Sequence, residues 1–168
     1  MQDDPVLGIS AGQLWLDRRE LIRNLGAQMA NQAHRELLLF SHALDPDLYD
    51  QRPFLDALQT LALARPDLPV RILLYDSQTP CQNGHRLIEL ARRLTSRIAI
   101  RRVENDDQKR QDAFLIADRC GYIYRQIAGT MEAIADFNSP GEAGRLRTTF
   151  IQLWDRGTTD LQMRQLFI

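Results

Sequence analysis

The sequence has few cysteines, a single lysine and no long apolar stretch, and each scarcity excludes a class of protein. Cys81 and Cys120 stand too far apart for a metal-binding spacing. No apolar run approaches the ~20 residues that a membrane-spanning helix requires. The first residues are acidic and are not followed by the apolar core of a signal peptide. We therefore expect a cytoplasmic protein without membrane segments, with both thiols free.

The composition is that of an ordinary globular chain. Of 168 residues, 44% are apolar and 26% are charged, which indicates one domain that can bury its own core. The formal net charge of -1 gives no general attraction to nucleic acid or to acidic membranes, so we expect neither as a partner. The arginines within residues 92–102 fall on several faces of the predicted elements, which favours a solvated surface over a phosphate-binding patch.

The hydrophobic pattern alternates between strands and helices along the chain. Short apolar runs predict strands over residues 14–16, 37–41, 70–75, 98–103, 113–117 and 122–127. Apolar residues at helical spacing predict helices over residues 17–33, 53–66, 85–95 and 139–154, and a short last helix at 161–166. This order predicts an α/β fold: a mixed, mostly parallel sheet covered by helices on both faces, with a C-terminal hairpin and a closing helix.

Two of the predicted helices begin with capping signals. Asp17, with Glu20 three residues later, forms a capping box. The segment Ser139-Pro140-Gly141-Glu142 combines an N-cap serine, a first-turn proline and a glutamate at the third helical position. We expect the helix after Ser139 to bury Phe150 and Trp154.

One strand carries a recognisable motif. Residues 111–118 read Gln-Asp-Ala-Phe-Leu-Ile-Ala-Asp, an apolar strand followed by an aspartate. This segment resembles a strand of the phospholipase D superfamily, in which a His, any residue, a Lys and four further residues precede an Asp. Asp118 matches the Asp, whereas Gln111 stands at the His position and Ala113 stands at the Lys position. The resemblance implies one half of the phospholipase D fold with a degenerate site.

The resemblance covers about residues 35–156, the expected core of a single domain over residues 1–168. A closer likeness is to a bacterial domain family of uncharacterised function, whose members occur alone or fused behind N-acetyltransferases. The segments shared with that family are Leu44-Asp45-Pro46, Leu48-Tyr49-Asp50, Gly84-His85-Arg86-Leu87 and Asp160 to Leu166.

The two replacements decide which chemistry the resemblance implies. In a phospholipase D site the His attacks phosphorus and the Lys neutralises the phosphoryl oxygens. Gln111 cannot attack phosphorus or carry a proton near neutral pH, and Ala113 has no charge. We therefore do not expect phosphodiester hydrolysis. The interpretation is a non-catalytic binding or regulatory module with no cofactor.

Open α/β sheets bind ligands at the carboxyl ends of their strands. Residues next to those ends form the predicted cleft, in which Asp118 is expected to be an orienting carboxylate bonded to a backbone group or to Arg125. The predicted cleft residues are Gln111, Asp118, His42, Asp76, Arg125 and Asn138.

Two other functions stay open. A hydrolase of another class would use His85, Cys81 or His42, and it requires two of these side chains to converge in one pocket. The fused relatives leave open an accessory role beside an acetyltransferase. The acidic residues 104–107 lack the spacing and the glycine of an EF-hand, so no metal site is expected.

The resemblance also bears on self-association. A phospholipase D site needs two half-motifs, and single-motif relatives form dimers that place the two halves face to face. A symmetric homodimer is therefore open, as is a monomer, because a domain of 168 residues can stand alone. The apolar Leu166-Phe167-Ile168 would cover the core or meet a partner.

Overall fold

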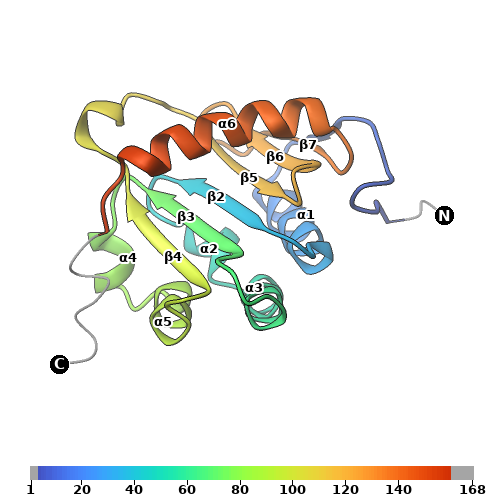
Figure 1. Cartoon of the computed structure of the whole chain (residues 1–168). Helices are drawn as coiled ribbons and strands as arrows, with labels where there is room; N and C mark the ends of the chain where they lie inside the picture. The colour runs from blue at the N-terminus through green and yellow to red at the C-terminus, as the bar shows by residue number, and fades with distance from the viewer. Residues whose placement is uncertain (1–3, 160–168) are drawn as a thin grey trace.

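The computed structural model describes residues 4–159. In this part seven strands form one sheet, with α6 on one face and α1, α3 and α5 on the other (Figure 1). The strands are β1 Leu14–Leu16, β2 Leu37–Ser41, β3 Val70–Leu74, β4 Ile98–Arg102, β5 Ala113–Ala117, β6 Gly121–Arg125 and β7 Ala133–Asp136. The helices are α1 Arg19–Gln32, α2 Pro46–Tyr49, α3 Arg52–Ala64, α4 Gln78–Gln82, α5 Arg86–Arg93 and α6 Pro140–Arg156, with a 3-10 turn at Asn105–Asp107. The short helix predicted at residues 161–166 lies outside the described residues.

The sheet is mixed, with strand order β1-β7-β6-β5-β2-β3-β4. The α/β class, the hairpin of β5 and β6 and the closing helix α6 are as predicted. The sheet is less parallel than the sequence suggested, because only the β2–β3 and β3–β4 pairs are parallel. The pairs β2–β5, β5–β6, β6–β7 and β1–β7 are antiparallel. Tight turns join β5 to β6 and a short loop joins β6 to β7, and such connections link antiparallel neighbours.

The two faces of the sheet carry separate hydrophobic cores, and β2 shows how one strand supplies both. All five of its residues are buried, and successive side chains point to opposite faces. Leu37 and Leu39 join the larger core under α1, α3 and α5. Leu38 and Phe40 join the smaller core under α6. Helices therefore cover both faces, as the continuous apolar run of this strand predicted.

The helix α6 has the buried face expected from its spacing. Phe150 and Trp154 are buried against the sheet, and their rings stack with centroids 5.9 Å apart. The helix begins at Pro140 as predicted, although the Ser139 side chain makes no capping hydrogen bond. At the first helix the predicted capping box does not form: the N-cap position is Arg18, so Asp17 lies one residue too early.

One strand was not foreseen in the sequence. β7 reads Ala-Ile-Ala-Asp, which is too short and too rich in alanine to give a strand signal. It is held between β6 and the edge strand β1, so tertiary pairing defines it. Within residues 4–159 no helix is both long enough and apolar enough to cross a membrane.

Candidate functional site

The predicted cleft residues are best located by the strand ends that they adjoin. β2 and β3 end at one edge of the sheet, and β5 begins there because it runs antiparallel to β2. β6 returns from the hairpin and also ends there. Four of the six predicted cleft residues lie along this edge, which we call the site edge: His42, Asp76, Gln111 and Arg125.

The other two predicted cleft residues lie at the opposite edge. Asp118 follows β5 and Asn138 follows β7, and both of these strands run away from the site edge. The backbone N–H of Ser139, next to Asn138, donates to the Cys120 carbonyl at 2.7 Å, which fixes this second group near the β5–β6 turn. The structure thus separates Asp118 and Asn138 from the other four predicted cleft residues, since β5 and β7 have the opposite direction to β2.

Asp118 has a structural role that its sequence position only partly suggested. Its carboxylate accepts hydrogen bonds from the backbone N–H groups of His34, Arg35 and Glu36 at 2.8, 2.7 and 3.1 Å. These groups belong to the connection between α1 and β2. The residue has a positive φ of 52°, as a tight turn requires. Of the two partners expected, the backbone is the correct one and Arg125 is not.

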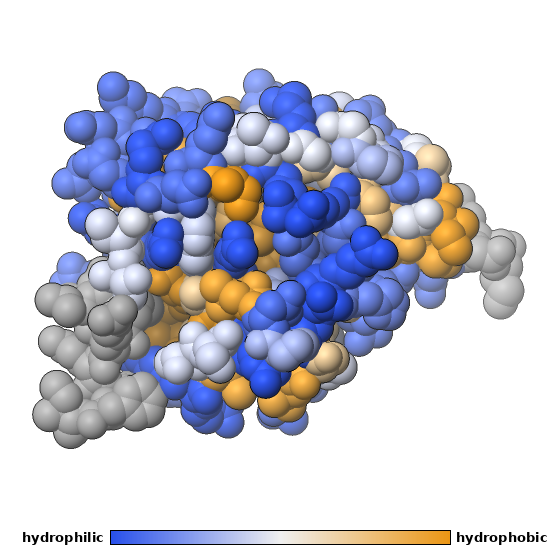
Figure 2. Space-filling view, in the orientation of Figure 1, coloured by the Kyte–Doolittle hydropathy of each residue, from blue (hydrophilic) through white to orange (hydrophobic). Residues whose placement is uncertain are grey.

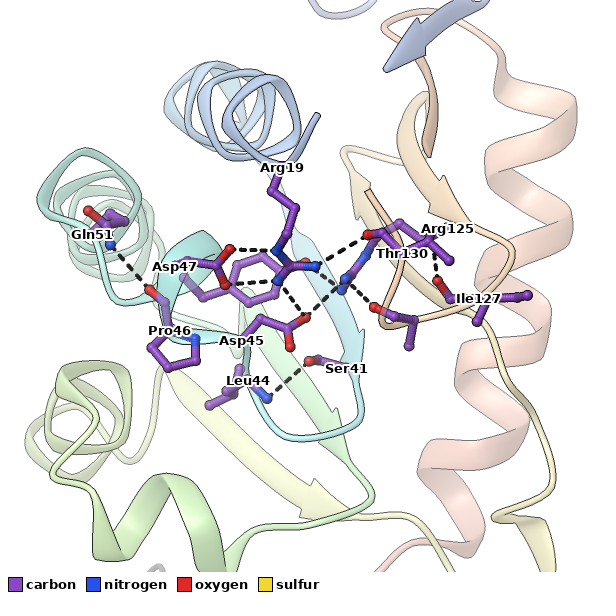
Figure 3. Close-up of polar contacts among 12 residues, drawn as sticks. Arg19, Ser41, Leu44, Asp45, Pro46, Asp47, Gln51, Arg125, Ile127 and Thr130 are labelled. Atoms are coloured by element: carbon purple, nitrogen blue, oxygen red, sulfur yellow. Dashed lines mark hydrogen bonds and ion pairs between the residues drawn. The ribbon is translucent and has the colours of Figure 1, made fainter. Parts of the chain in front are cut away.

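The site edge holds a buried arginine. Arg125 is only 2% exposed, and its Nη1 donates to Asp45 Oδ2 at 2.9 Å and to the Ala128 carbonyl at 2.6 Å (Figure 3). Its Nη2 reaches the Tyr49 hydroxyl at 3.5 Å. A buried cation is tolerated only when it is paired and hydrogen-bonded, and Asp45 supplies the pairing charge.

A second arginine extends this arrangement toward solvent. Arg19, from the start of α1, binds Asp47 through Nε at 2.5 Å and Nη2 at 2.8 Å, as Figure 3 shows. Its Nη2 lies 3.6 Å from Asp45 Oδ2, and its Nη1 donates to the Thr130 carbonyl at 3.3 Å. The hydrogen bond from Arg19 holds the pKa of Asp47 below its ordinary value. We call Arg19, Asp45, Asp47 and Arg125 the Arg125 network.

The Arg125 network stands beside Ala113, the residue that the resemblance aligns with a lysine. Ala113 is the register partner of Arg125 across the β5–β6 pair, so the two residues face the same side of the sheet. Ala113 is fully buried. Gln111, two residues earlier, is exposed, and its carbonyl accepts from the Ala128 N–H at 2.7 Å.

The opposite face of the same edge carries a cluster that the sequence analysis missed. Asp112 is 5% exposed, and its carboxylate accepts from Arg110 Nε at 2.9 Å and Nη2 at 2.6 Å. The Tyr124 hydroxyl donates to the same carboxylate at 3.0 Å. A signal was present: Asp112 and Phe114 share a face by their spacing of two, and Tyr124 pairs with Phe114 in the hairpin. We call Arg110, Asp112 and Tyr124 the Asp112 cluster.

His42 borders this cluster. Its Nε2 lies 3.1 Å from the Asp112 carbonyl oxygen, and its ring stacks on Tyr75 with centroids 4.1 Å apart. The Tyr75 hydroxyl donates to the Arg110 carbonyl at 2.8 Å. Burial lowers the pKa of His42, so the ring is neutral at pH 7.

Asp76 is at the site edge, where its carboxylate is bonded to the turn that follows β3. Its carboxylate accepts from the backbone N–H groups of Gln78 and Thr79 at 3.0 and 3.1 Å, and from the Thr79 hydroxyl. These bonds lower the pKa of Asp76 and fix the start of α4. Asp76 therefore anchors a turn.

The residues considered for a different hydrolase do not assemble into a dyad of histidines. Both ring nitrogens of His85 are used by backbone groups: Nδ1 accepts from the Leu87 N–H at 3.1 Å, and Nε2 lies 3.0 Å from the Leu44 carbonyl oxygen. His42 lies instead against Asp112. Cys81 and Cys120 form no disulfide. Within residues 4–159 there is no group of three or more His, Cys, Asp or Glu placed to hold a metal ion.

Three of the four segments that suggested a closer family likeness meet in one place, and the fourth, Asp160 to Leu166, lies outside the described residues. Arg86 binds Asp50 through Nε at 2.6 Å and the Asp50 carbonyl through Nη2 at 2.9 Å. His85 reaches back to Leu44, a residue with a positive φ of 55°. The start of α5 thereby fixes the loop that presents Asp45 to Arg125.

Comparison with known proteins supports the fold. A sequence family described as Domain of unknown function (DUF7931) matches residues 18–166. No curated protein matches the sequence. Among solved structures, NucT from Helicobacter pylori is similar with a TM-score of 0.65 at 10% identity, over 89% of this chain and 98% of that chain. The phospholipase D family member Nuc from Salmonella typhimurium gives 0.59 at 15% identity, over 82% and 90%.

A third similar structure is longer than this chain. TrmBL2, an archaeal chromatin protein, gives a TM-score of 0.64 at 14% identity over 90% of this chain, which spans 55% of TrmBL2. At these identities the likeness shows the phospholipase D-like fold alone.

Proposed function

The chain belongs to the family described as Domain of unknown function (DUF7931), and on its phospholipase D-like fold we propose a non-catalytic binding or regulatory module. The observation that carries the proposal is the pairing of Arg125 with Asp45 beside Ala113. Arg125, the register partner of the residue at the lysine position of the resemblance, is already paired with the Asp45 carboxylate and hydrogen-bonded to the Ala128 carbonyl.

The chemistry required for hydrolysis is not supplied by the neighbouring groups. Phosphoryl transfer through a phosphoenzyme needs a nucleophile and an unpaired cation that stabilises the phosphoryl oxygens. Gln111 is no nucleophile, and Asp45 places negative charge where a phosphodiester would bring its own. Loss of one member of such a constellation lowers the rate by several orders of magnitude.

The test is an assay with bis(p-nitrophenyl) phosphate, a generic chromogenic diester. We expect the rate with the protein to equal the rate in buffer. Hydrolysis above buffer that is lost in Gln111→Ala and kept in Gln59→Ala would overturn the proposal. Gln59 is an exposed glutamine on α3 and serves as the matched control.

As the partner we propose a second copy of the chain, because exposed apolar side chains occur together on one region of the surface. Six of the seven large apolar side chains that are exposed within residues 4–159 belong to the N-terminal segment, β1 and the loop between β6 and β7. Trp15 and Met131 are 71% and 60% exposed. Exposed apolar groups gathered in this way mark interaction surfaces. We propose that this surface pairs two copies by two-fold symmetry.

Sedimentation equilibrium at micromolar concentration tests the pairing. A dimer that becomes a 19.4 kDa species in Trp15→Ser but not in Leu63→Ser is the expected result. Leu63 is the seventh exposed apolar residue and lies on α3. A 19.4 kDa species for the unmodified chain at all concentrations would exclude the dimer.

A further inference from the structure

The sheet face that α6 crosses is only partly covered by that helix. α6 packs on β2, β5 and β6, and its outer surface is mainly hydrophilic (Figure 2). Beyond the helix, Tyr122 of β6 pairs with Asp136 of β7, and Tyr124 pairs with Ile134. Paired side chains share a face, and Ile134 pairs in turn with the exposed Trp15 of β1. Three strands thus present side chains on an open part of this face.

A hollow of about 360 Å³ lies on this open part, beside the start of α6. The described residues that line it include two carboxylates, Asp136 and Glu142, and neither arginine nor lysine, although the chain holds 21 of these cations. Tyr122, Ile134 and Ser139 also line it. A lining of this charge disfavours an anionic ligand and favours a cation.

Tyr122 carries a hydroxyl that no described residue satisfies. The residue is 3% exposed, and its ring belongs to the hydrophobic core under α6. Its hydroxyl forms no hydrogen bond within residues 4–159. Among these residues only Gln28 Oε1 is an enclosed side-chain oxygen or nitrogen without a partner, so the Tyr122 hydroxyl opens into the hollow that its residue lines. Since buried polar groups are almost always hydrogen-bonded, this hydroxyl indicates a partner within the hollow.

Asp136 is a buried charge without an ion pair among the described residues. Arg125 and Asp112 are also buried, but each of them is paired with an opposite charge. Asp136 Oδ1 accepts from the backbone N–H groups of Gly12 and Asn138 at 3.2 and 3.0 Å, which fixes the carboxylate. Oδ2 has no hydrogen-bond partner within residues 4–159. A buried charge is tolerated when it is paired, so this oxygen offers a place for a cation.

The rim of the hollow adds one more free hydroxyl and one compensated charge. The Ser139 side chain makes no capping bond to α6. Glu142, in the first turn of α6, accepts from Arg145 Nε at 3.1 Å and also from its Nη2. Arg145 therefore neutralises Glu142 and leaves the charge of Asp136 to a ligand.

We propose that the hollow binds an alkylammonium group, that is, a primary ammonium on an apolar stem. An ammonium carries three N–H donors and no acceptor. These donate to Asp136 Oδ2 and to the hydroxyl oxygens of Tyr122 and Ser139. The stem lies along the apolar Ile134 and the ring of Tyr124, which both line the hollow.

Two sources share this chemistry: a free alkylamine and the lysine side chain of a protein partner. The proposal rests neither on the lack of hydrolysis nor on the pairing of two copies, so the failure of one leaves the others standing. A magnesium ion and a neutral alcohol are the competing ligands, because both also bind to carboxylate and hydroxyl oxygens.

An NMR titration of the full chain with pentylamine hydrochloride tests the proposal. The backbone amide signals of Gly12 and Asn138 report on the site, because both groups donate to Asp136. We expect both signals to shift to saturation with pentylamine. Neither should shift with pentan-1-ol, which has the same stem without the charge, or with magnesium chloride. An equal saturable response to the alcohol or to magnesium would overturn the proposal.

Two variants separate ligand binding from folding. Asp136→Asn removes the charge and should weaken pentylamine binding about tenfold or more. Tyr122→Phe should weaken it about tenfold and leave the urea midpoint unchanged, because its hydroxyl has no partner in the described chain. Glu89→Gln, an exposed carboxylate on α5, is the matched control and should bind normally. Unchanged affinity in both Asp136→Asn and Tyr122→Phe would overturn the proposal.

A second probe distinguishes the two sources of the ammonium group. Nα-acetyl-lysine N-methylamide presents a lysine side chain as a protein would. Tighter binding of this probe than of pentylamine assigns the hollow to a lysine of a protein partner. Binding of pentylamine alone assigns it to a free alkylamine, and either result supports the alkylammonium site.

Discussion

The two faces of the site edge bury opposite charges. On one face Arg125 is a buried cation whose side chain is 2% exposed, and its partner Asp45 is 30% exposed. On the other face Asp112 is a buried anion whose side chain is 6% exposed, and the side chain of its partner Arg110 is 38% exposed. In both cases the buried member lies on or beside the β5–β6 pair, and the more exposed member neutralises it. The difference lies in how the partner is anchored.

Asp45 comes from a distant part of the chain, and Arg110 is only two residues from Asp112. Asp45 therefore ties the loop before α2 to β6, whereas Arg110 closes a local contact. Removing a partner that fixes distant elements and leaves a buried cation should cost more than removing one that water can replace. The following variants test this ranking.

The largest effect is expected for Asp45→Ala. It leaves the Arg125 guanidinium buried with only neutral partners, and breaking a buried pair in this way costs 3–5 kcal/mol; we expect about 3 because Asp45 is partly exposed. Urea unfolding measures the change. The matched control is Asp47→Ala, whose partner Arg19 remains accessible to water.

A second substitution distinguishes the cost of an unpaired buried cation from the cost of the lost contacts. Replacing a buried ion pair by apolar residues is often neutral. Arg125→Met in the Asp45→Ala background should therefore recover most of the lost free energy of unfolding. If the double variant is as unstable as Asp45→Ala alone, the cost does not arise from an unpaired cation.

Arg110→Ala should have a smaller effect. Asp112 keeps the Tyr124 hydroxyl and gains water where Arg110 was, so we expect a loss of about 1–2 kcal/mol. Arg145→Ala removes an exposed i,i+3 pair with Glu142 and should leave the urea midpoint unchanged. A loss for Arg110→Ala that matches Asp45→Ala would contradict the ranking of the two faces.

Much of the fold was accessible from the sequence because local patterns define it. The continuous apolar run of β2 and the helical spacing of Phe150 and Trp154 each specify an element and its buried face. Strand direction was not accessible in the same way. The reversal of β5 relative to β2 depends on pairing across 70 or more residues, as between Phe40 and Phe114.

The antiparallel direction of β5 relative to β2, which the sequence did not indicate, explains the errors in the predicted cleft. Asp118 and Asn138 were placed with His42 on the assumption that strand ends coincide, and the antiparallel half of the sheet puts them at the other edge. Asp112 was missed because its role depends on Arg110 and Tyr124 meeting it in space. Arg125 was predicted at the cleft, but its pairing with Asp45 required the loop before α2 to be positioned by α5.

The pair of Arg19 and Asp47 should contribute little. Both side chains are partly exposed, so Arg19→Ala is expected to cost about 0.5 kcal/mol at pH 7. Arg19 lowers the pKa of folded Asp47, so its contribution is present above the unfolded pKa of about 4 and is lost as pH falls through the lower folded value. Urea midpoints of the two proteins should therefore converge on acidification. A constant difference down to pH 2 would exclude Asp47 as the titrating partner.

The smallest expected effect is a shift in the pKa of His42. Charged groups on both faces of the site edge act on this pKa. Burial is the main cause of its lowered pKa, the nearby charge of Arg125 lowers it further, and Asp112 opposes this. The stability that neutral His42 contributes is present above its ordinary pKa of about 6.5 and is lost as pH falls through the lower folded value. His85 is also lowered by burial, but Arg125 is not among the charges that act on it.

Ring proton chemical shifts followed by NMR against pH distinguish the two histidines. In Asp45→Ala/Arg125→Met, the loss of the larger influence, Arg125, should raise the pKa of His42, while His85 stays unchanged as the internal reference. A His42 titration identical in both proteins would show that the two faces are electrostatically separate. A parallel shift of both histidines would instead indicate a general loosening of the fold, because only burial is common to them.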